Sequence, residues 1–95
     1  MFKKRWFNVI VSDEEFTVKI PGKVGLRYKE GRRTMFIDSE VMAAGTKPDI
    51  IIFKKSIQTW KPPYDKDIID DTRREEIIEN VRQALVFYGW EIEVV

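Results

Sequence analysis

The chain has 95 residues, of which 43% are hydrophobic and 13% aromatic, which is enough for one folded core and argues against disorder. It has no cysteine and no histidine, so it cannot form disulfides and lacks the commonest catalytic bases and transition-metal ligands. Residues 1–63 hold 13 Lys and Arg against 7 Asp and Glu, and residues 64–95 hold 4 against 9. The net charge of +1 therefore conceals a dipolar chain.

No apolar run approaches the roughly 18 residues of a membrane-spanning helix. The basic start precedes an apolar stretch that is too short for a secretory signal and lacks a small-residue cleavage site. The absence of cysteine fits a reducing compartment, so we expect a cytoplasmic protein. The length predicts a single domain over residues 1–95.

Alternation of apolar and polar residues predicts four strands in the first half, at residues 6–11, 16–20, 26–29 and 34–38. In the first of these, Phe7, Val9 and Val11 share one side. Glu30-Gly31-Arg32 is a tight hairpin signal between the last two. Residues 39–44 are ambiguous and allow a helical turn before Gly45.

Residues 49–53 contain an unbroken isoleucine run, which is typical of a strand covered on both faces or of a central one. Consecutive prolines exclude regular structure from residues 60–64, which lead into a helix. Trp60 in this segment either covers one end of the core or is an exposed anchor for a partner. Residues 90–94 alternate again and predict a final edge strand that can pair in parallel with the strand at 50–53.

The long helix is predicted over about residues 71–88. Thr72 and Glu75 have the spacing of a capping box at its start, and Gly89 suits the left-handed turn at its end. Its apolar stripe consists of Ile77, Ile78, Val81, Ala84, Leu85 and Tyr88, with Val86 on the opposite face. The sequence thus predicts an α+β domain: a five- to six-stranded, mainly antiparallel sheet, one helix packed on one face, and a short final strand.

The chemistry of the side chains indicates no enzyme, no catalytic residue and no cofactor. Ser12, Ser39 and Ser56 lie in no nucleophile motif, and no glycine-rich phosphate loop occurs. The aspartates of residues 65–71 suggest a calcium loop, but Ile69 stands where a ligand is needed and Asp70 where glycine is needed. We interpret them as acids that stabilise the helix start, so we predict no metal site. The alternative is an enzyme that uses only carboxylates and lysines, which would need a pocket that gathers several of them.

Three cations, Lys19, Arg27 and Lys29, fall opposite the apolar positions of their strands, and so do Phe36 and Trp6. A sheet face that mixes cations with aromatic rings is typical of proteins that bind single-stranded nucleic acid. A single-strand-binding regulator is therefore one interpretation of this face, and a solvated outer surface is the other.

Four motifs in order resemble the immunity-protein family numbered seventy-four over about residues 16–94. They are Arg27-Tyr28-x-Glu30-Gly31-x-Arg33, Ile37-Asp38-Ser39-Glu40, Ser56-Ile57-x-x-Trp60-x-Pro62-Pro63, and Arg74-x-x-Ile77-x-x-Asn80-Val81-Arg82-x-Ala84-Leu85 followed by Gly89. This family is predicted to protect bacteria against toxins of polymorphic toxin systems. The segment before about Phe16 does not clearly match.

The resemblance implies a protein that binds a cognate toxin and blocks it without catalysis. An acidic surface would mimic the substrate of a toxin that acts on nucleic acid, so the candidate partner-binding residues are Asp65, Asp67, Asp70, Asp71 and Trp60. The resemblance implies packing roles for Tyr28 and Trp60, backbone roles for Gly31 and Gly89, and a pair between Arg33 and Glu40. We expect no membrane partner, and a homodimer stays open.

Overall fold

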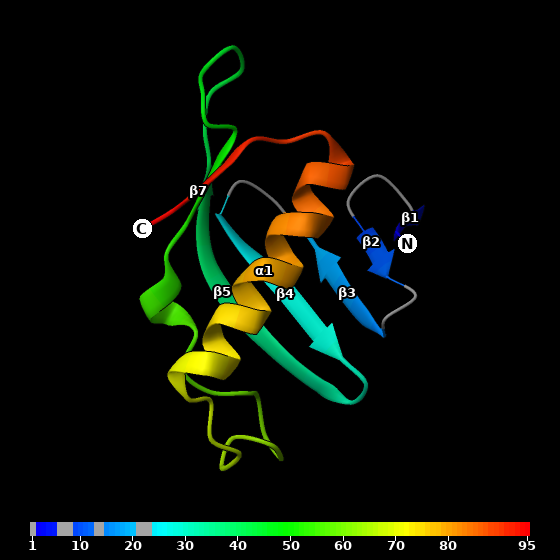
Figure 1. Ribbon diagram of the computed structural model, residues 1–95, viewed down its shortest axis with the longest axis vertical. Coiled ribbons are helices and arrows are strands. Elements are labelled where there is room, and N and C mark those ends of the chain that lie inside the picture. Colours follow the sequence, from blue (N-terminus) through cyan, green and yellow to red (C-terminus); the bar gives the residue numbers. More distant parts are fainter. Residues whose placement is uncertain (1, 6–8, 13–14, 21–23) are drawn as a thin grey trace.

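The computed structural model describes residues 2–5, 9–12, 15–20 and 24–95. These residues form one sheet, the 3-10 helix η1 (Lys54–Ser56) and the long helix α1 (Asp71–Tyr88). The strands are β1 (Phe2–Arg5), β2 (Val9–Ser12), β3 (Phe16–Lys19), β4 (Val24–Glu30), β5 (Arg33–Val41), β6 (Ile50–Ile52) and β7 (Ile92–Val94). Their order in the sheet is their order in the sequence (Figure 1).

Strands β1 to β6 pair antiparallel, and β7 pairs in parallel with β6 after the crossover through α1. The parallel pairing and the α+β class are confirmed. The sheet has seven strands rather than five or six, because β1 adds an edge strand that was not predicted. An edge strand needs little apolar alternation, and the Phe-Lys-Lys-Arg sequence of β1 shows none.

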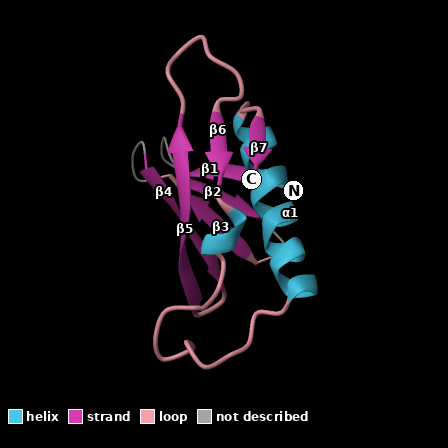
Figure 2. Cartoon of the chain, turned by 90° about the vertical axis from the view of Figure 1, so that its left-hand side faces the viewer, coloured by secondary structure: helices cyan, strands magenta, loops and turns pink. Residues whose placement is uncertain are grey.

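The core lies between α1 and the sheet, which form two layers (Figure 2). The helix contributes Ile77, Ile78, Val81, Ala84 and Leu85, as its apolar stripe predicts, while Tyr88 is half-buried against the same core and Val86 is exposed. None of the helices in the described part of the chain has the length and apolar character needed to cross a membrane.

The C-terminal end of α1 is as predicted, whereas its N-terminal cap is a different residue. Gly89 adopts the predicted left-handed conformation, with φ of 98°, and its N–H bonds back to the last turn. The helix begins at Asp71 as predicted, but the predicted cap is wrong: Asp70 rather than Thr72 is the N-cap, and its Oδ1 accepts the N–H of Arg73 at 2.8 Å. Aspartate is among the best N-cap residues, so the earlier of two candidates begins the helix.

Two strand predictions need correction or extension, and two others are confirmed. In β2, Ile10 and Ser12 are buried while Val9 and Val11 are half-buried on the other face; Phe7 lies outside the described residues. Strand β5 continues to Val41, so residues 39–41 form no helical turn. The hairpin at residues 30–33 is confirmed, as is the interior position of β6 between β5 and β7.

The pairing register between β4 and β5 shifts at a bulge between Val24 and Leu26, at the start of β4. Gly25 has φ of 85° there, and a methyl group on it would overlap the ring of Phe36. The missing side chain lets this ring lie across the outer face of the sheet, where it remains 44% exposed.

Candidate partner-binding surfaces

The predicted acidic group, Asp65, Asp67, Asp70 and Asp71, lies in the loop before α1 and in its first turn. Asp67 Oδ2 accepts a hydrogen bond from Arg33 Nε at 2.9 Å and forms an ion pair with Arg33 Nη2 at 2.7 Å. Asp71 pairs with Arg74 at 2.6 Å, and Asp70 caps the helix. Three of the four carboxylates are therefore already occupied by the protein's own donors.

The partner of Arg33 differs from the predicted one. Arg33 and Glu40 stand near opposite ends of β5, whereas the loop brings Asp67 to Arg33. The guanidinium of Arg33 also lies over the Tyr64 ring, 4.8 Å from its centroid. These contacts hold the loop against the sheet and leave Ile68 beside them, 88% exposed.

A chain of hydrogen bonds runs from the helix to the sheet above this loop. Asn80 Nδ2 donates to the Tyr28 hydroxyl at 2.8 Å, and that hydroxyl donates to Glu30 Oε1 at 2.9 Å. Glu30 Oε2 in turn pairs with Nη2 of Arg73. Burial raises the pKa of Tyr28 above its usual value, and the Asn80 hydrogen bond, which lowers it, only partly offsets this.

Trp60 belongs to the core and is not an exposed anchor. It is only 3% exposed, its ring stacks on Tyr28 with centroids 6.2 Å apart, and Arg73 lies over it at 5.8 Å. Of the two interpretations left open by the sequence, packing is correct, because the residues around Trp60 leave almost none of its surface to a partner.

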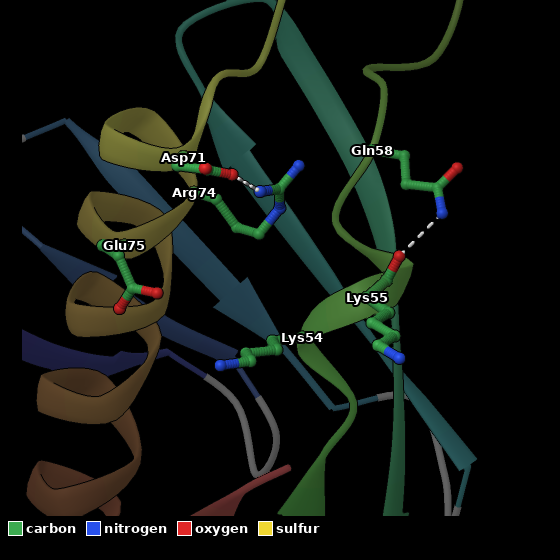
Figure 3. Close-up of a pocket in the computed structure, with 6 residues that line it drawn as sticks. All are labelled: Lys54, Lys55, Gln58, Asp71, Arg74 and Glu75. Carbon is green, nitrogen blue, oxygen red and sulfur yellow. Dashed lines mark hydrogen bonds and ion pairs between the residues drawn. The ribbon is translucent and has the colours of Figure 1, made fainter.

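An open hollow of about 630 Å³ lies between η1 and the start of α1 (Figure 3). Arg74 stands between the two segments, donating to Asp71 and, through Nε at 2.9 Å, to the carbonyl of Ile57. Lys54 extends toward the helix on the side of Glu75 in Figure 3. Both cations and carboxylates line this hollow, so it favours neither sign of ligand.

The outer face of the sheet, opposite α1, carries the predicted cations in adjoining rows. Lys19 lies opposite Arg27, and Arg27 lies opposite Phe36, so one row crosses three strands. In the next row Lys29 lies between Thr17 and Thr34. The structure thus brings together every predicted residue of this face except Trp6, which lies outside the described residues.

A fourth cation, Lys61, joins this face from a distant segment. Its N–H donates to the Thr34 carbonyl at 2.8 Å, which places it beside the first half of β5. A hollow of about 220 Å³ is lined by Lys61 together with Thr17, Lys19, Arg27, Lys29 and Thr34. We call Lys19, Arg27, Lys29 and Lys61 the basic face; the sequence contained no signal for Lys61, because a loop brings it there.

The outer surface changes sign beyond the basic face. Asp38 and Glu40 on β5 and Glu93 on β7 are exposed at outward positions of their strands. Asp65 lines the hollow on the far side of Lys61. Among the described residues, no three acidic side chains gather in a way that could hold a metal ion.

The fold and these surfaces define a small two-layer α+β protein whose charged groups lie on open faces. The chain belongs to the immunity protein 74 family, because the sequence model of that family matches residues 21–95. The resemblance drawn from the ordered motifs is therefore confirmed. Neither a curated protein nor a solved structure matches the chain.

Proposed function

We propose that the protein neutralises a cognate bacterial toxin of a polymorphic toxin system by stoichiometric protein–protein binding in the cytoplasm. Membership of the immunity protein 74 family is the observation that carries this proposal. A chain without histidine or cysteine suits it, since an inhibitor that blocks its target by contact needs no nucleophile or general base.

The test is co-expression with the toxin domain encoded beside the gene of this chain. We expect the immunity protein to restore growth and to form a complex of fixed stoichiometry with the toxin domain in light scattering. The free protein, measured alone, separates a monomer from a homodimer. Persistent growth arrest together with separate elution of the two proteins would reject the proposal.

The acidic group remains a proposed toxin-binding surface for a toxin whose own surface is basic. Its test is the variant D65K/D67K/D71K, in which Asp70 is kept because it caps α1. For a basic toxin, association should become slower at low salt, because opposite charges steer the encounter. Unchanged affinity and rate would remove this surface from consideration.

A second candidate function is single-stranded nucleic-acid binding through the basic face. The observation that favours it is the cross-strand row of Lys19, Arg27 and Phe36, which places two cations beside an exposed ring. Titration with a fluorescent single-stranded oligonucleotide at low and raised salt tests it. Affinity that falls steeply with salt would support this function, and no binding at micromolar protein would reject it.

A further inference from the structure

The basic face keeps positive charges close together without counter-charges. Lys19 and Arg27 lie directly opposite each other, an arrangement that destabilises a sheet because like charges repel across the strands. No ion pair reaches this face from the rest of the described chain. By contrast, five of the other cations pair with carboxylates: Arg33, Lys47, Arg73, Arg74 and Arg82. Lys54, Lys55 and Lys66 are exposed as well, but they do not face one another across paired strands.

The basic face also contains a hollow that a ligand group could enter. Its hollow of about 220 Å³ has two threonine side chains between the cations, which offer hydroxyl groups to a ligand. Phe36 lies opposite Arg27, which lines this hollow, and the missing side chain of Gly25 lets the tip of the Phe36 ring occupy a position that a methyl group would exclude. The cations thus surround a small depression and have an apolar ring at their edge.

We propose that the basic face is the surface that receives the toxin, and that the toxin presents a cluster of carboxylates to it with an apolar side chain against Phe36. This inference rests on the proposed function. Carboxylates of the toxin would relieve the repulsion among the cations of the basic face, and this relief favours binding. The acidic group offers no such gain, because three of its four carboxylates already have donors in the free protein.

An acidic protein surface fits this face better than a nucleic-acid strand does. From β3 to the Lys61 segment the face spans three strand spacings, roughly 14 Å, which is short for the groove of about four or more nucleotides that a single-strand site usually covers. Asp38 and Asp65 stand at its borders and would repel a continuing phosphate backbone. A protein can instead place its own cations against those borders.

The experiment compares two variants with equal changes in net charge. K19E/R27E/K29E reverses the basic face, whereas K54E/K55E/K66E reverses three exposed lysines elsewhere. Binding to the toxin domain encoded beside the gene is measured by stopped-flow and at equilibrium, at low and raised salt. We expect the first variant to bind about 100-fold more weakly, chiefly through slower association at low salt, and the second to change affinity by less than about threefold.

The single variant R27E tests whether a loss of toxin binding could come from misfolding. This change places a carboxylate opposite Lys19, so the variant should unfold at a higher urea concentration than the parent while it binds the toxin domain more weakly. Loss of binding together with gained stability cannot come from a damaged fold.

Each outcome separates the possibilities. Toxin binding by the parent that survives K19E/R27E/K29E but is lost in D65K/D67K/D71K would overturn the inference and leave the proposed function standing. No binding of the toxin domain by the parent protein would overturn both. Tight, salt-sensitive binding of a twenty-nucleotide oligo(dT) that K19E/R27E/K29E abolishes, with no toxin complex, would assign the face to nucleic acid instead.

Discussion

The start of α1 and the outer face of β3 to β5 carry similar charged side chains in opposite circumstances. At the helix start Arg33, Arg73 and Arg74 each meet a carboxylate, and Asp70 meets a backbone N–H. On the outer face Arg27 meets Lys19 on one side and the Phe36 ring on the other. An arginine that has a partner supports the fold, whereas one opposite another cation weakens it.

This difference teaches that local net charge is a poor guide to a binding surface. The acidic group is prominent in the sequence, yet the folded chain satisfies most of it internally. The basic face is less prominent because its four members come from three strand or loop segments, and only pairing makes them neighbours. The charge available to a partner is what remains after internal pairing.

The largest expected effect on stability comes from Arg73→Ala. It leaves the Glu30 carboxylate, whose side chain is only 22% exposed, without its cation and uncovers Trp60. We expect a loss of about 2 kcal/mol in the free energy of unfolding, measured in urea. The control Arg82→Ala, on the same helix but with an exposed pair to Glu79 at 3.7 Å, should cost less than about 1 kcal/mol. Equal losses would show that the charges at the helix start contribute no more than surface pairs.

Tyr28→Phe tests the hydrogen-bond chain that supports the same region. The lost hydroxyl leaves Asn80 and Glu30 each short of one bond, so unfolding at pH 7 should become about 1 kcal/mol easier.

The same variant carries a pH dependence. Because the folded pKa of Tyr28 is raised above 10, the neutral phenol contributes stability that is complete below pH 10 and is lost as the pH rises through the folded pKa. The urea midpoint of unfolding should therefore fall more between pH 7 and pH 11 for the parent than for Tyr28→Phe. Parallel losses in the two proteins would contradict the raised pKa.

Arg27→Glu changes the other region in the opposite direction. A carboxylate opposite Lys19 replaces repulsion by attraction, and we expect a gain of about 0.2–1 kcal/mol in the free energy of unfolding. Arg32→Glu in the hairpin turn alters the net charge equally and serves as the control, with no such gain expected. A destabilised Arg27→Glu variant would show that the cations of the outer face do not oppose folding.

A double-mutant cycle on Arg33 and Asp67 measures an effect as small as that of Arg27→Glu and sharpens the comparison most. Both side chains are 46% exposed, so their coupling energy should lie between about 0.2 and 1 kcal/mol and should shrink in salt. A coupling near zero would mean that Asp67 can leave Arg33 for a toxin at no cost. In that case the acidic group regains its place as a binding surface.

Sequence reasoning succeeded where a repeating pattern determines the structure. The 3.6-residue period located α1, and the two-residue period assigned Lys19, Arg27 and Phe36 to the outer face before any pairing was known. It failed for β1, whose edge position requires no pattern, and for the N-cap, where two suitable residues competed.

Side-chain pairing was beyond the reach of sequence patterns. Arg33 meets Asp67 across 34 residues, and Arg73 meets Glu30 across 43. Such pairs depend on how a loop returns to the sheet, which no local spacing records. The burial of Trp60 was undecided for the same reason, since Tyr28 and Arg73 reach it from other elements.

The agreement between sheet order and chain order has a consequence for biosynthesis. Strands β1 to β6 each pair with the strand next along the chain, so hairpins can form one after another as the polypeptide leaves the ribosome. The apolar face of that growing sheet stays uncovered until α1 emerges and β7 pairs with β6. A nascent chain halted before residue 71 would therefore contain every residue of the basic face but would lack the helix that covers the opposite, apolar side of the sheet.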